Sequence, residues 1–109
     1  EPIRMSWLFL SIGIVFEVCG TICMKLSNGF TQILPSVVMM ICYMASLGML
    51  TLALKQIPMN VAYAIWAGVG TLLVVMLGLF FFHETLSIPK LASILLIILG
   101  VVGVRLSGG

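Results

Sequence analysis

Long apolar stretches separated by short polar ones run through the whole sequence. About 20 consecutive apolar residues are what an α-helix needs to cross the hydrocarbon core of a bilayer. The stretches do not alternate between apolar and polar residues, as the strands of a transmembrane β-barrel do. The pattern therefore predicts an all-α membrane protein, with residues 1–109 as a single four-helix transmembrane domain and helices at about 5–24, 34–54, 61–82 and 91–106.

The connections between these stretches are short and contain residues that end or begin helices. Asn28 and Gly29 follow the first stretch, Pro58 follows the second, and Pro89 stands where a fourth helix would begin. Asn-Gly favours a turn, and proline either ends a helix or occupies its first turn. Helices adjacent in sequence should therefore pack as antiparallel neighbours. The first stretch is longer than the roughly 7–15 residues of a signal-peptide core, so it is interpreted as a retained helix.

Composition and charge narrow the class of protein. The chain is 62% hydrophobic and 7% charged, whereas about 25% of the residues in a typical soluble domain are charged. An ordinary soluble domain is therefore excluded, and a net charge of +2 spread over the connections offers no surface for nucleic acid.

The basic residues are nearly balanced across the membrane. Antiparallel helices place Arg4, Lys55 and Arg105 on one side and Lys25 and Lys90 on the other. Basic residues near the span ends favour the cytoplasmic side, so this balance gives little preference for one orientation. The chain could insert both ways round and form an antiparallel homodimer. The alternative is that smaller asymmetries select a single orientation.

Glu17 is the acidic residue in the interior of a predicted span. Its insertion costs roughly 2.5–3.5 kcal/mol, so such residues usually face a bundle interior or a wet cavity on a transport path. Helical spacing puts Gly13, Gly20 and Thr21 on the same face, which leaves room for a ligand beside the carboxylate. A proton and an organic cation would compete for that carboxylate. The alternative is a structural glutamate, hydrogen-bonded inside the bundle.

Aromatic residues could supply the other half of a cation site. Tyr63 and Trp66 are three residues apart near the start of the third helix, and Tyr43 lies in the second. Ring faces attract organic cations, tryptophan most strongly. The alternative is that these residues anchor the helices at the membrane interface, a role that suits Trp7 well.

Small residues mark two further features. Gly68 and Gly70 stand in the third helix, where paired glycines favour a kink and hence a hinge for alternating access; close packing against another helix is the alternative. Ser93, Leu96 and Gly100 lie at helical spacing in the fourth helix, and such a stripe favours close helix association. This stripe is the candidate dimer contact, with an intrasubunit contact as the alternative.

No cofactor or metal site is expected. Three cysteines without nearby histidines make a poor metal site, and residues 83–87 lack the second histidine of a zinc-protease motif. His83 and Glu84 are therefore interpreted as part of a solvated turn.

Several stretches together carry a resemblance to a known family. They are Glu17 followed by Val18 and Gly20, then residues 24–31, Pro35 with Ser36, Tyr43, and the run Ala62-Tyr63-Ala64-Ile65-Trp66-Ala67-Gly68-Val69-Gly70. Over nearly its whole length the chain resembles the small multidrug resistance transporters. The resemblance implies a proton-coupled exporter of the bacterial inner membrane that works as an antiparallel homodimer. It also implies that Glu17 binds protons and substrate, that Tyr43, Tyr63 and Trp66 line the site, and that residues 68–70 form the kink.

The resemblance also points to a subtype. Guanidinium exporters of this family typically carry a tryptophan three residues after the glutamate, where this chain has Gly20. The chain therefore resembles the subtype that exports quaternary ammonium compounds and other lipophilic cations. Ala67 and Ser93 depart from residues frequent in the family. The alternatives are a guanidinium-type exporter, a pairing of unlike subunits, and a non-transporting accessory subunit. An enzyme is disfavoured because the sequence shows no nucleophile-base arrangement.

Overall fold

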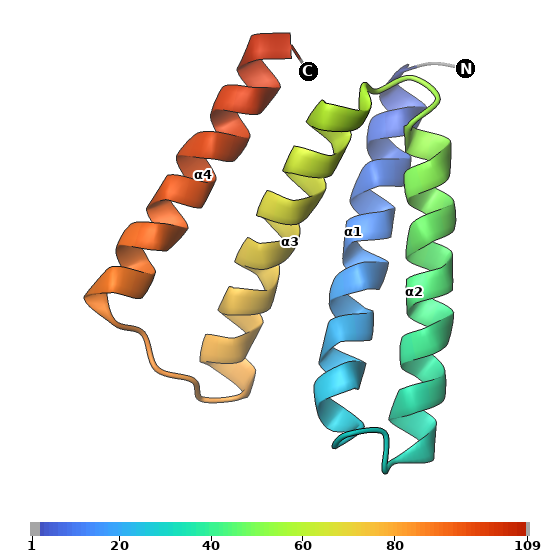
Figure 1. Cartoon of the computed structure of the whole chain (residues 1–109), viewed down its shortest axis with the longest axis vertical. Helices are drawn as coiled ribbons and strands as arrows, with labels where there is room; N and C mark the ends of the chain where they lie inside the picture. The colour runs from blue at the N-terminus through green and yellow to red at the C-terminus, as the bar shows by residue number, and fades with distance from the viewer. Residues whose placement is uncertain (1–2, 109) are drawn as a thin grey trace. The chain divides into compact units, whose positions relative to one another are not determined.

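The computed structural model describes residues 3–108, and these residues are almost entirely helical. They form α1 (Ile3–Leu26), α2 (Ile33–Ala53), α3 (Met59–Phe81) and α4 (Ile88–Gly108), with no strand in that range (Figure 1). All four helices are long and apolar enough to cross a membrane. The predicted all-α membrane fold is confirmed, and the observed helix ends lie within one turn of the predicted ones.

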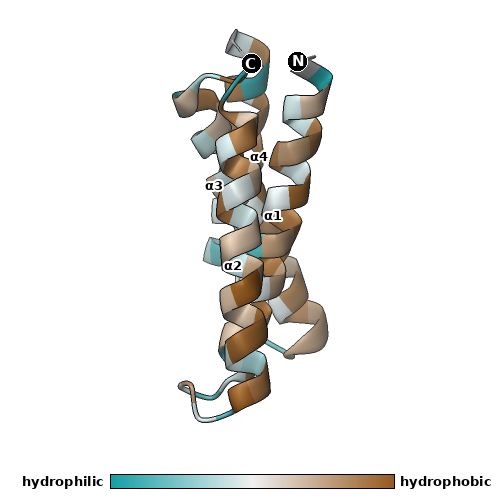
Figure 2. Ribbon diagram, turned by 90° about the vertical axis from the view of Figure 1, so that its right-hand side faces the viewer, coloured by the Kyte–Doolittle hydropathy of each residue, from teal (hydrophilic) through white to brown (hydrophobic). Residues whose placement is uncertain are grey.

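The chain divides into two compact units, Glu1–Ile57 and Pro58–Gly109. The first contains α1 packed along α2, and the second contains α3 in contact with α4. Each unit is an antiparallel helical hairpin, as the short connections predict. Figure 2 shows that hydrophobic residues cover much of each helix while the connections are largely hydrophilic. Large apolar side chains such as Leu34, Phe81 and Leu106 are exposed, as expected where lipid replaces water around a protein.

The turn between α1 and α2 is built on Ser27 and on three residues in the left-handed region. Asn28, Gly29 and Phe30 have φ values of 50°, 70° and 69°. The buried Ser27 hydroxyl donates to the Met24 carbonyl at 2.7 Å and accepts from the Phe30 amide at 3.2 Å. Asparagine and glycine tolerate this backbone conformation, so the prediction of an Asn-Gly turn is confirmed.

The connection between α3 and α4 ends one helix and caps the next. The Gly78 carbonyl accepts from the amides of both Phe82 and Glu84, at 3.2 and 3.0 Å. The Ser87 hydroxyl accepts from the Lys90 amide at 3.3 Å, which is the bond that an N-cap serine makes at the start of a helix. Pro89 lies in the first turn of α4 as predicted.

Candidate functional site

The Tyr43 ring lies directly against the backbone of Gly20. A β-carbon added at Gly20 would be 2.7 Å from both Cδ1 and Cε1 of Tyr43, and 3.4 Å from Cβ of Cys42. Two carbon atoms cannot approach that closely, so only a hydrogen fits beneath the ring in this arrangement. Gly20 is thus what allows α2 to place an aromatic ring on the face of α1 that carries Glu17.

A hydrogen-bond chain links Tyr43 to the helical turn of Glu17. The Thr21 hydroxyl donates to the Glu17 carbonyl at 3.0 Å, and the oxygens of Thr21 and Tyr43 are also 3.0 Å apart. A hydroxyl has one proton to donate. Because Thr21 uses its proton on the Glu17 carbonyl, Tyr43 is the donor to Thr21. The structure therefore brings Gly20, Thr21 and Tyr43 together. The sequence alone placed the first two on one helix and Tyr43 on another.

The Glu17 side chain is half-buried on α1, and Gly13, one turn earlier, is buried. Within described residues 3–57, the carboxylate has no hydrogen-bond or ion-pair partner. Inside this hairpin it is therefore not held as a structural glutamate. Its role in binding protons and cationic substrates remains a prediction.

The two aromatic residues of α3 belong to the second unit. Tyr63 is 62% exposed and Trp66 is 8% exposed, and they lie one helical turn apart. Most of the Tyr63 surface is therefore uncovered, whereas Trp66 is buried. The role of this pair beside Glu17 remains a prediction.

Helix α3 continues without interruption through Gly68 and Gly70. A β-carbon at Gly68 would overlap a methyl group of Val101 and would lie 3.6 Å from one of Ile97. Gly68 is therefore a point of close approach between α3 and α4, which is the packing alternative raised from the sequence. A hinge at residues 68–70 remains a prediction.

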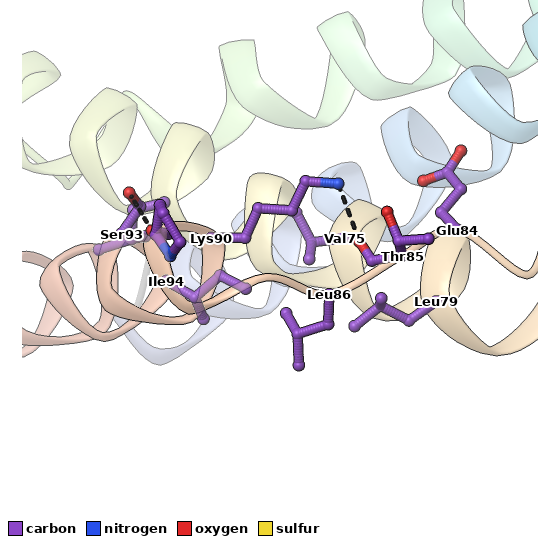
Figure 3. Close-up of a pocket in the computed structure, with 10 residues that line it drawn as sticks. Val75, Leu79, Glu84, Thr85, Leu86, Lys90, Ser93 and Ile94 are labelled. Atoms are coloured by element: carbon purple, nitrogen blue, oxygen red, sulfur yellow. Dashed lines mark hydrogen bonds between the residues drawn. The ribbon is translucent and has the colours of Figure 1, made fainter.

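In the predicted dimer stripe on α4, Leu96 and Gly100 lie away from this contact, whereas Ser93 lines a pocket that α3 and α4 share (Figure 3). Ser93 and Gly100 are exposed, Leu96 is 68% exposed, and a β-carbon at Gly100 would meet nothing within 4 Å. Helix α4 contacts Gly68 of α3 through Ile97 and Val101 instead. Leu96 and Gly100 are therefore not needed for the contact between α3 and α4, and the role of the stripe as the dimer contact remains a prediction.

The described part of the chain, residues 3–108, contains no group of three or more histidine, cysteine or acidic residues that could hold a metal ion. Cys19, Cys23 and Cys42 are free thiols.

Known proteins are similar to this chain over nearly its whole length. The sequence model of the Small Multidrug Resistance protein family matches residues 5–97. The chain is 50% identical over 102 residues to the uncharacterized membrane protein YvaE of Bacillus subtilis, covering 94% of this chain and 86% of that protein. It is 43% identical over 100 residues to the multidrug transporter EmrE of Escherichia coli, covering 92% and 91%. It is also 34% identical over 103 residues to the guanidinium exporter of Proteus vulgaris, covering 94% and 99%.

The family model matches most of the chain, and the relatives are similar along nearly all of it. The structure adds four helices that are long and apolar enough to span a membrane. The chain belongs to the small multidrug resistance family, whose members are transporters, and it is a multi-pass protein of the bacterial inner membrane.

Proposed function

We propose that this protein is a proton-coupled antiporter that exports lipophilic and quaternary ammonium cations, and that it works as an antiparallel homodimer. The observation that carries the proposal is the packing of Tyr43 on Gly20 one turn beyond Glu17. This arrangement places an aromatic ring against α1 within one helical turn of the residue that carries the carboxylate. Ring faces attract organic cations, and the attraction increases where water is excluded.

The exchange cycle follows from competition at Glu17. An ionised carboxylate attracts the cation on the cytoplasmic side, and protons arriving from outside replace the cation and release it outward. A pH difference of one unit supplies about 1.4 kcal/mol for each proton. Each net charge moved inward gains about 2.3 kcal/mol per 100 mV of membrane potential. These gradients can drive export against a substantial concentration difference.

The guanidinium alternative has support from relatives that are named guanidinium exporters and are 34–36% identical to this chain. The packing at position 20 favours the proposed substrate class instead. In the resemblance described above, guanidinium exporters carry a tryptophan at this position. A side chain here would have to displace the Tyr43 ring, which lies 2.7 Å from the added β-carbon. Without the indole the site has more room and fewer hydrogen-bond donors, which suits bulky cations that form no hydrogen bonds.

The proposal is tested by proton release from the purified protein in weakly buffered detergent. Adding tetraphenylphosphonium should release protons, whereas guanidinium at the same concentration should release few. Glu17→Gln should abolish the release because it removes the titrating group. Release by guanidinium alone would establish the guanidinium alternative. If Glu17→Gln retained full export and resistance, Glu17 would have no role in exchange and the chain would fit an accessory subunit.

A further inference from the structure

Three free thiols lie in the α1–α2 hairpin around Gly20. Cys19 and Cys23 belong to α1, and Cys42 belongs to α2. The β-carbon of Cys42 is 3.4 Å from the position of a β-carbon at Gly20, so this cysteine packs directly on α1. Nothing in the proposed exchange cycle uses these thiols, and their place in the interface between the two helices therefore suggests a separate chemistry.

Cys23 is the thiol of α1 that shares the packed face with Gly20. Gly20 and Ser27, one turn before and one turn after it, are both buried. Residues three apart on a helix have β-carbons about 5–6 Å apart, and Cys42 packs at Gly20, so Cys23 and Cys42 are diagonal neighbours across the interface. The two thiols are also close enough for their charges to interact, and this interaction is larger than the one between Cys42 and Cys19.

The exposure of the thiols separates this pair from the third cysteine. Cys19 is exposed, whereas Cys23 and Cys42 are half-buried. The pair is therefore shielded but not sealed in a core, and a lipid-soluble reactant can reach it. Cys23 lies three residues before the end of its span at Leu26, which is about 4.5 Å along the helix. Water is close at this depth, so a thiol there can release the proton that must leave before its sulfur reacts.

We propose that Cys23 and Cys42 are a redox modification site, at which a lipid-soluble quinone oxidises the two thiols to a disulfide that ties α1 to α2. The sulfur–sulfur bond forms and the two S–H bonds break, while the quinone takes up two electrons and two protons and leaves as the quinol. The bond brings the two β-carbons to about 3.5–4.5 Å. Because it joins helices that already pack together, it stabilises the hairpin against unfolding.

The test is oxidation of the purified full-length protein in detergent by a fully substituted ubiquinone analogue, whose ring has no open position for alkylation of thiols. Intact-mass spectrometry should show that the wild type loses two hydrogen atoms, and peptide mapping should find Cys23 bonded to Cys42. Cys19→Ser is the matched control and should form the same disulfide, whereas Cys23→Ser and Cys42→Ser should not form one. A wild type that keeps three free thiols, a disulfide from Cys19, or one between two copies would overturn the proposal.

Thermal unfolding gives a second readout that does not depend on the folding of a variant. The oxidised wild type should unfold at a higher temperature than the reduced protein, because a disulfide restricts the unfolded chain. Dithiothreitol should remove this shift, and Cys19→Ser should show it in full. Equal unfolding temperatures for the oxidised and the reduced wild type would show that the bond distorts the hairpin, which contradicts the neighbouring positions proposed for Cys23 and Cys42.

Discussion

The Tyr43 ring rests on the backbone of Gly20, with two ring carbons only 2.7 Å from the position of a β-carbon at that glycine. The same tyrosine donates a hydrogen bond to Thr21, the next residue of α1. One aromatic side chain of α2 is therefore fixed at two adjacent positions of α1, and Thr21 in turn bonds to the carbonyl of Glu17. Substitutions at these positions should affect the hairpin and the cation site together.

Gly20→Ala should destabilise the α1–α2 hairpin and weaken tetraphenylphosphonium binding. The added methyl group must push the Tyr43 ring away, and overpacking of this kind costs about 1–3 kcal/mol. Thermal unfolding in detergent and equilibrium binding measure the two effects. Gly48→Ala is the matched control, because a β-carbon at Gly48 on α2 meets nothing within 4 Å. Wild-type stability and affinity in Gly20→Ala would show that the ring does not occupy this position in the membrane.

Thr21→Val and Tyr43→Phe should show energetic coupling. Each removes one partner of the bond between the two hydroxyls, so the double variant should be less destabilised than the sum of the single variants. The expected coupling is about 0.5–1.5 kcal/mol, the usual net value of a hydrogen bond. Thr51→Val provides a control, since that hydroxyl bonds to Leu47 of its own helix at 2.8 Å. Strict additivity would mean that the bond contributes nothing to stability.

Binding of tetraphenylphosphonium should weaken as the pH falls. In the proposed exchange cycle, protons and the cation compete for Glu17, so affinity should decrease by up to about tenfold per pH unit for each proton that the cation displaces. Affinity should reach a plateau at high pH, where the free protein has already lost the proton. Isothermal titration at several pH values measures this dependence. Glu84→Gln should keep the dependence because Glu84 lies at the connection, whereas a pH-independent affinity in the wild type would remove the basis of coupling.

Gly68→Ala should weaken the packing of α4 on α3, because the added methyl group overlaps Val101. Adding Val101→Ala should restore stability by making room for it. The double variant also separates packing from hinge motion. If it binds substrate normally but transports slowly, residue 68 acts in a conformational change; if transport is also restored, its role is close packing. Thermal unfolding and transport in proteoliposomes provide the two measurements.

Gly100→Leu should weaken self-association without changing the helix content. A β-carbon at position 100 meets nothing within 4 Å, so the larger side chain does not disturb the α3–α4 hairpin. It should instead interfere with a close contact between two copies of α4. Light scattering in detergent and far-UV circular dichroism test the two statements. An unchanged dimer would place the subunit contact on another surface.

The sequence by itself determined the four spans, the two short turns at Asn28–Gly29 and Pro58, and the exceptional position of Glu17. These features depend on local properties: the length of an apolar run, the backbone preference of a few residues, and the cost of a carboxylate in hydrocarbon. For the same reason it could predict that Gly13, Gly20 and Thr21 share a face with Glu17, since residues three or four apart in a helix always do.

Only the tertiary structure decided which side chain of one helix meets which residue of its neighbour. That choice depends on how each helix is rotated about its axis and shifted along it. The sequence of a helix that is apolar on all sides does not determine this rotation or shift. Gly20 on α1 and Gly68 on α3 therefore differ in a way that the sequence does not reveal. Gly20 accommodates the Tyr43 ring and Gly68 accommodates Val101. Glu84, expected in a solvated turn, folds against Gly78 because the end of α3 positions its backbone.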